Sequence, residues 1–213
     1  MTARIKYNEA LIIFTKIAEL GKVKTRLAKS IGENRALEVY RELMEHTRDI
    51  TMDLNVDRRV YFTPSPPDKH QIWDKEHYDY FQQSDGDLGF RMSQAFKETF
   101  EQGYDKVIII GCDCAELTSD ILRKAFEELD HADFIIGPAK DGGYYLLGMN
   151  EYEPSIFEDK EWSTETVFED TISDLIDRKK IWYELPILSD VDTEEDLRRV
   201  QFLIKQRKLR EMT

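Results

Sequence analysis

The stretch "DKVIIIGCDC" (residues 105–114) decides the expected fold. Its unbroken apolar run is typical of a strand buried on both faces, as in a parallel sheet, rather than of a half-exposed strand with alternating polarity. Because side chains alternate along a strand, Asp113 is expected to point away from Cys112 and Cys114. An acid directly after such a strand could hold a divalent cation or could simply cap the next turn.

Similar apolar runs along the chain predict further strands that alternate with amphipathic helices. Ser30 and Glu33 have the spacing of a capping box for the first long helix, and Thr118 or Ser119 is the expected N-cap of the third. The strands are predicted at 10–14, 58–63, 78–83, 105–111, 133–137, 143–149 and 180–185, and the helices at 32–54, 89–102, 118–130, 163–179 and 194–208.

This alternation predicts an α/β fold. Strands separated by helices form βαβ units, which build a mostly parallel, doubly wound sheet with helices on both faces. In such sheets, ligands bind outside the carboxyl ends of the strands. The residues that follow each strand are therefore the first place to look for chemistry.

Length and charge restrict the function further. The 213 residues fit a single domain, 1–213, and the net charge of −13 argues against binding of DNA or RNA through phosphate neutralisation. No apolar run approaches the ~20 residues of a membrane-spanning helix, so a cytoplasmic protein is expected. Two closely spaced cysteines fit a reducing compartment. The oligomeric state is left open.

One basic stretch interrupts this acidic chain. "ELGKVKTRLAKS" (19–30) carries four cations and one acid, and Lys16 precedes it. It follows the first predicted strand, so it lies at the ligand-binding edge, where a loop rich in cations predicts a small anionic ligand. The chain contains neither G-x-x-x-x-G-K-[ST] nor G-x-G-x-x-G, which argues against a P-loop and a dinucleotide fold.

Three further segments at this edge each allow two interpretations. In "SDVDTEED", Asp192 has capping-box spacing with Glu195, yet it could also bind a metal. In "GPAKDGGYY", Asp141 could act as a general base or could only form a hairpin turn. In "SDGDLGFRM", Asp87 and the helix N-terminus could bind a ligand or form an ordinary capped turn.

Taken together, six motifs resemble a known family. They are similar, in order and over about residues 10–200, to the DUF2064-type family of proposed glycosyltransferases in the nucleotide-diphospho-sugar transferase superfamily. The chain lacks the Pro-x-Pro-Gly element usual in the first loop, and Ala115 replaces the proline that usually follows the metal strand. The motifs are VKTRLAKSIG, QQSDGDLGFRM, IIIGCDCAEL, GPAKDGGYYLLGM, WSTETVFEDT and DVDTEEDL.

The resemblance implies a Rossmann-like, glycosyltransferase-A-type fold and a set of roles. By the resemblance, Asp113 and Asp192 would bind Mg²⁺ or Mn²⁺, and Lys24 would bind phosphate. In the mechanism expected from these roles, Lys24 would also assist catalysis, and Asp141 would be the catalytic base if a sugar is transferred. The remaining nucleotide- and phosphate-binding residues would be Lys16, Arg26, Gly86, Asp87, Gly89 and Arg91. The sugar or acceptor would contact Asp141, Gly142, Gly143 and Tyr144.

The function implied is a metal-dependent transferase with a nucleotide-activated donor. Glycosyl transfer from a nucleotide-diphospho-sugar to a small-molecule acceptor is the first hypothesis. The alternative is nucleotidyl transfer, in which a phosphorylated substrate attacks an NTP and pyrophosphate leaves. A non-catalytic nucleotide-binding module is the second alternative. The nucleobase, the sugar, the acceptor and the stereochemical outcome stay open.

Overall fold

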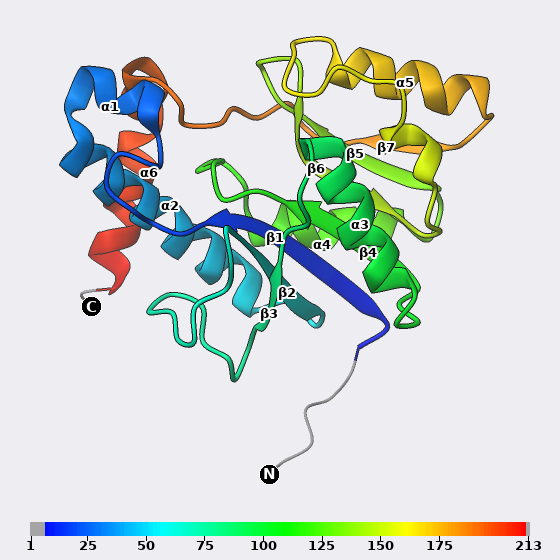
Figure 1. The fold of residues 1–213 in the computed structure, drawn as a ribbon, viewed down its shortest axis with the longest axis horizontal. Coiled ribbons are helices and arrows are strands. Elements are labelled where there is room, and N and C mark those ends of the chain that lie inside the picture. The colour runs from blue at the N-terminus through cyan, green and yellow to red at the C-terminus, as the bar shows by residue number, and fades with distance from the viewer. Residues whose placement is uncertain (1–6, 212–213) are drawn as a thin grey trace.

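The computed structural model describes residues 7–211, with residues 203–211 described by their backbone only. It contains a single seven-stranded sheet in the order β3-β2-β1-β4-β6-β5-β7 (Figure 1). The strands are β1 (Glu9–Lys16), β2 (Asp57–Thr63), β3 (Asp79–Gln82), β4 (Lys106–Ile110), β5 (Phe134–Pro138), β6 (Tyr144–Met149) and β7 (Trp182–Glu184).

The sheet is mixed but mostly parallel, as predicted. The strands β3, β2, β1 and β4 run parallel to one another, and β5 runs parallel to β7, whereas β6 is antiparallel to both β4 and β5. The helices are α1 (Thr25–Ile31), α2 (Glu33–Met52), α3 (Leu88–Phe100), α4 (Ser119–Glu128), α5 (Val167–Asp177) and α6 (Glu194–Glu211), with a 3₁₀ turn η1 (Pro154–Phe157).

Helices cover both faces of the sheet because successive residues of each strand point in opposite directions. On β1, Leu11 and Ile13 pack with α2 and α4, whereas Ala10 and Ile12 pack with α3, η1 and α5. A third cluster joins α1, α2 and α6, which lie together in Figure 1. None of the helices in the described residues is long and apolar enough to cross a membrane.

Two predicted capping boxes are wrong, each for a local reason. Ser30 lies inside α1, a short helix in the stretch that was predicted to be a loop. The helix α2 begins after Gly32, whose φ of 83° favours glycine. The second box lies one residue further along than expected. The Thr193 hydroxyl accepts from the Asp196 amide at 3.3 Å, and Asp196 accepts from the Thr193 amide at 2.9 Å. Asp192 is thereby free of a capping role.

Candidate functional site

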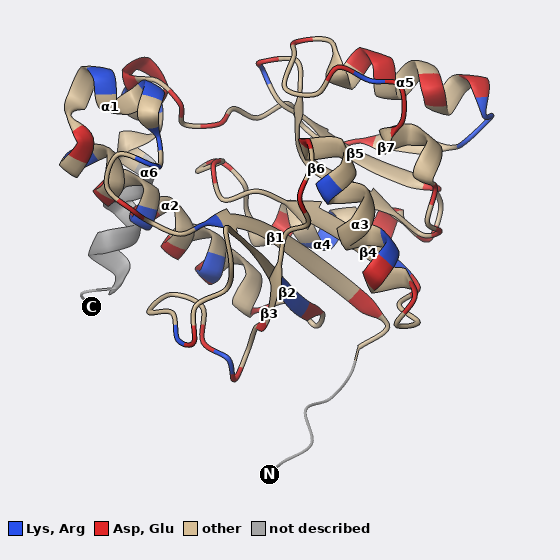
Figure 2. Ribbon diagram, viewed as in Figure 1, with Lys and Arg blue, Asp and Glu red and all other residues tan. Residues whose placement is uncertain are grey.

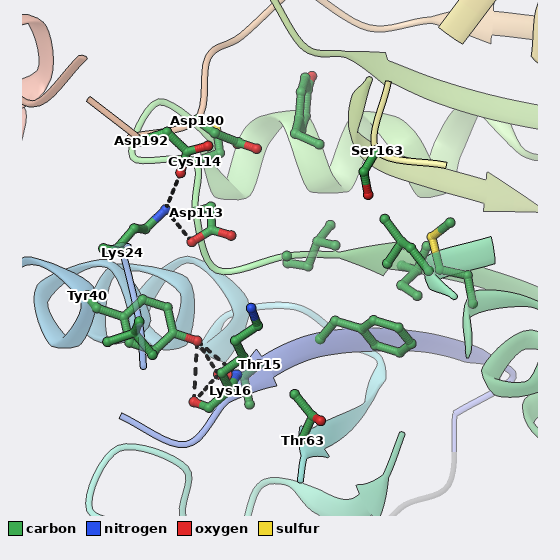
Figure 3. A pocket seen from close by; sticks show the side chains of 18 of the residues that line it. Thr15, Lys16, Lys24, Tyr40, Thr63, Asp113, Cys114, Ser163, Asp190 and Asp192 are labelled. Atoms are coloured by element: carbon green, nitrogen blue, oxygen red, sulfur yellow. Dashed lines mark hydrogen bonds and ion pairs between the residues drawn. The ribbon is translucent and has the colours of Figure 1, made fainter. Parts of the chain in front are cut away.

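A cavity of about 480 Å³ opens at the carboxyl ends of β1 and β4, where the sequence predicted the ligand edge (Figure 3). Its walls come from the ends of these strands, from the loop after β1, from α3 and β6, and from the segments that precede α5 and α6. Most of these segments are far apart in sequence, and the sheet topology brings them together.

Lys24 is the centre of one wall of this cavity. Its ammonium lies 2.6 Å from Asp113 Oδ1 and 3.1 Å from Asp192 Oδ1 (Figure 3), and only 4% of the side chain is exposed. Burial lowers the pKa of Lys24, but the charges of Asp113 and Asp192 outweigh it and raise the pKa to about 12. The ammonium therefore stays charged at physiological pH.

The backbone of Lys24 is also unusual. It is the N-cap of α1 in a left-handed conformation, with φ 47°, and its side chain makes no capping bond. A non-glycine residue in this region costs about 1–2 kcal/mol, and surrounding contacts must hold it there. The two carboxylates supply such contacts.

Asp113 and Asp192 are brought together by the backbone. Cys112 and Cys114 are buried in the core, so Asp113 between them faces the cavity, as the alternation predicted. The Val191 amide donates to the Asp113 carbonyl at 2.9 Å and ties the segment before α6 to the end of β4. Since Thr193 caps α6, both oxygens of Asp192 are available to cations.

A third carboxylate, Asp190, lines the same cavity and was missed by the sequence analysis. Its burial, followed by the nearby charge of Asp113, raises its pKa well above the ordinary value for an aspartate. The only signal in the sequence is its spacing in "SDVD", two residues before Asp192. That signal alone does not distinguish it from a loop aspartate.

Two of the other predicted cations lie near this cluster. Arg26 approaches Asp192 Oδ2 at 3.5 Å with 71% of its side chain exposed, and Lys16 lines the cavity at the end of β1. The Tyr40 hydroxyl fixes this end of β1 because it accepts from the Lys16 amide at 2.8 Å and lies 3.2 Å from the Thr15 hydroxyl. In Figure 2, the cations of α1 lie beside acids at the start of α6.

The "SDGDLGFRM" segment forms a capped turn. Asp87 accepts from the Phe90 amide at 2.8 Å as the N-cap of α3, and neither it nor Gly86 lines the cavity. Arg91 does line it, and donates to Gln83 Oε1 at 3.3 Å. Gly89 lies against Trp162, so closely that a Cβ atom there would be 2.0 Å from the indole.

The "KDGGY" segment is the hairpin turn between β5 and β6. Asp141 is exposed and accepts from the Gly143 amide at 3.1 Å. Neither Asp141 nor the glycines line the cavity, whereas Tyr144 does. The Tyr144 hydroxyl is buried and has no partner among the described residues. Asp141 thus makes a turn contact and does not line the cavity, although its charge contributes to the raised pKa of Asp190, which does line it.

Comparison with known families identifies the chain's relatives. A family described as "Uncharacterized protein conserved in bacteria (DUF2064)" matches residues 47–164. The chain belongs to this family. The matched region contains β4 and Asp113, which follows it, and ends one residue after Ser163, another cavity residue. None of the curated proteins matches the sequence.

Solved structures of similar fold extend this comparison. A proposed nucleotide-diphospho-sugar transferase from Desulfovibrio desulfuricans G20 is 28% identical, with a TM-score of 0.81 over 93% of this chain and 97% of that one. An inositol-1-phosphate CTP transferase from T. maritima is 15% identical, with a TM-score of 0.56 over 92% of this chain and 94% of that one. A Mycobacterium tuberculosis H37Rv protein, Rv0371c, solved in complex with manganese, is 12% identical, with a TM-score of 0.55 over 94% of this chain and 100% of that one. The predicted superfamily fold is therefore confirmed.

Proposed function

We propose that this DUF2064 protein is a metal-dependent transferase whose donor is a nucleotide-diphospho-sugar. The observation that carries the proposal is the position of Lys24, a buried ammonium between Asp113 and Asp192 at the carboxyl edge of the sheet. A diphosphate needs cations around it, and this wall supplies a fixed one. The likeness to the D. desulfuricans protein supports the same donor class.

Each cation would have a distinct task. Lys24 would hold the diphosphate and neutralise the charge that develops on the leaving phosphate, which is the kind of preorganised charge that contributes most to catalysis. Arg26, near the start of α1, and Lys16, at the end of β1, would bind the outer phosphate oxygens. Arg91, on the α3 side of the cavity, would lie beside the nucleoside.

The carboxylates fit a divalent cation of the hard type. Asp113 and Asp192 already converge on one positive group, and no cluster of three metal-binding side chains occurs in residues 7–202. Mg²⁺ and Mn²⁺ are often held by one or two carboxylates, with substrate phosphates completing the shell, so the pair suits these ions. The ion would act as a Lewis acid that neutralises diphosphate charge. Lys24 would then shift toward the phosphates.

Nucleotidyl transfer is the second candidate, and the position of Asp141 favours it. A sugar hydroxyl acting as nucleophile needs a general base, but Asp141 lies in a turn outside the cavity. A phosphate nucleophile needs little help from a base. In this reaction the phosphate would attack the α-phosphate of an NTP and release pyrophosphate.

A thermal-shift screen tests the proposal and separates the two reactions. The ligands are UDP, GDP, ADP, CDP and dTDP, their sugar conjugates and the NTPs, each with and without Mn²⁺ or Mg²⁺. A ligand at about 100 times its Kd stabilises the folded state by ~2.7 kcal/mol. We expect metal-dependent stabilisation by one nucleoside diphosphate and its sugar conjugate. Stabilisation by NTPs alone, with pyrophosphate release, would replace glycosyl transfer by nucleotidyl transfer. No shift with any nucleotide would contradict both.

A further inference from the structure

The segment Asp159–Thr166, between η1 and α5, reaches the cavity through one residue, Ser163. Ser163 lines the cavity with its backbone in the left-handed region, at φ 67°, and Asp159 at the start of the segment is also left-handed, at φ 51°. Such conformations persist in non-glycine residues only when the surroundings hold them, and they cluster at ligand-binding sites. Ser163 and Lys24 lie on opposite sides of the cavity (Figure 3).

Two close contacts hold this segment in place. Trp162 lies against Gly89 of α3, and the Glu165 carbonyl oxygen lies only 1.9 Å from where a Cβ atom of Gly142 would be. The Phe168 amide also donates to the Gly142 carbonyl at 2.9 Å. Any side chain at either glycine would displace the segment. The glycines of two other motifs therefore serve to seat Ser163, although neither lines the cavity.

The cations and Ser163 reach the cavity from different elements. Among the described cavity residues, Lys16, Lys24 and Arg26 come from β1 and the start of α1, whereas Arg91 comes from α3, the helix against which Trp162 packs. The Asp159–Thr166 segment contributes only Ser163 to the lining, beside the neighbouring tyrosines of β6. The Ser163 hydroxyl makes no hydrogen bond to another of the described residues. The serine hydroxyl can both donate and accept a hydrogen bond, as the hydroxyl groups of a sugar can.

We propose that Ser163 hydrogen-bonds a hydroxyl of the sugar moiety of the nucleotide-diphospho-sugar, and that the Asp159–Thr166 segment positions Ser163 for this contact. This inference rests on the proposed function, since the diphosphate on Lys24 would direct the sugar toward Ser163. The sugar contact would then be Ser163, in a segment with no role predicted from the sequence, instead of the exposed "KDGG" turn that the sequence predicted.

The test compares, by calorimetry in the presence of Mn²⁺, the affinity of the protein for a nucleoside diphosphate with its affinity for the matching nucleotide-sugar. The pairs are UDP and UDP-glucose, GDP and GDP-mannose, and ADP and ADP-glucose, and the variants are measured with the pair that binds to the wild type. The variants are Ser163→Ala, which keeps the left-handed backbone, and Ser163→Gly, which relieves it. We expect both to bind the nucleotide-sugar roughly three- to tenfold more weakly, as for one lost hydrogen bond, and to bind the nucleoside diphosphate as the wild type does. The melting temperature should be higher for Ser163→Gly than for Ser163→Ala.

Asp159→Gly is the matched control. It relieves the other left-handed residue of the segment, which does not line the cavity, so both affinities should stay at the wild-type value. Nucleotide-sugar binding that is unchanged in both Ser163 variants would overturn the inference. So would an equal loss for both ligands, because Ser163 would then support the phosphate site. A folded wild type that binds no nucleoside diphosphate would instead overturn the proposed function.

Discussion

The sheet carries the same ionic arrangement at both of its ends. At the amino end of β4, Lys106 lies 3.1 Å from Glu9 Oε1 and 2.7 Å from Asp130 Oδ1. At the carboxyl edge, Lys24 lies at 2.6 Å and 3.1 Å from its two carboxylates, one of which follows β4. In each case one ammonium bridges two acids from separate segments.

The two lysines differ in what else surrounds them. Lys106 also donates to the Phe126 carbonyl at 3.1 Å, so its three N–H groups have three partners. Among the described residues, Lys24 forms ion pairs with two carboxylates, and a third acid, Asp190, lines the same cavity. Lys106 is thus satisfied by the fold, whereas Lys24 keeps a spare donor and lines a cavity that also holds Lys16, Arg26 and Arg91. An ion pair alone does not mark a ligand site; the spare donor and the cavity distinguish Lys24 from Lys106.

The largest expected effect separates the two lysines directly. Lys24→Met should weaken nucleoside diphosphate binding roughly 10- to 100-fold, because hydrogen bonds to charged groups contribute about 1.5–3 kcal/mol. Lys106→Met should leave the binding constant unchanged and lower the free energy of unfolding by about 1 kcal/mol, as expected for a partly exposed ion pair. Calorimetry and urea unfolding measure the two quantities. Equal losses of binding in both variants would remove the distinction between the two ends.

The acids of the two clusters give the second test. Asp113→Asn should remove most of the Mn²⁺-dependent gain in nucleotide affinity, about tenfold, because an amide is a poorer ligand than a carboxylate for a hard cation. Asp130→Asn, at the amino end, is the control and should keep the full metal effect. The measurement is the affinity for the nucleoside diphosphate with Mn²⁺ and with EDTA. A metal effect that survives in Asp113→Asn would exclude this carboxylate as a ligand.

Much of the fold could be predicted because the strands are short apolar runs separated by clear breaks. The strands β1, β4 and β5 are buried on both faces, so each of their sequences is a nearly continuous run of apolar residues, which is typical of strands in a parallel sheet. The short helix α1 was missed because five of its seven residues are polar or small and only Leu27 is buried. Helix starts were also misplaced: α5 begins at Val167 rather than at 163.

The candidate site could be predicted only in part, for a similar reason. The rule that ligands gather at the carboxyl ends of strands placed Lys24 and Asp113 at one edge. It could not place Asp190 or Ser163, since each lies in an irregular segment whose path is set by tertiary contacts. Ser163 depends on the packing of Trp162 against Gly89, which joins segments far apart in the chain. No local pattern encodes such a contact.

The smallest expected effect concerns two cations of the same basic stretch. Arg26 is 71% exposed beside Asp192, and Lys22 is 73% exposed and pairs with Glu19 at 2.5 Å. Arg26 lines the cavity and Lys22 does not. Arg26→Ala should weaken nucleoside diphosphate binding about threefold at low salt, and less at high salt, because exposed charges are screened.

Lys22→Ala removes the same charge from the same stretch and is therefore the matched control for Arg26→Ala. If Arg26 acts by contact with the diphosphate, only its replacement changes the affinity, and the melting temperature is unchanged in both variants. If instead both replacements weaken binding equally, the basic stretch acts through its overall field. In that case Lys24, which is buried and fixed, would be the one cation of the stretch that differs from the rest.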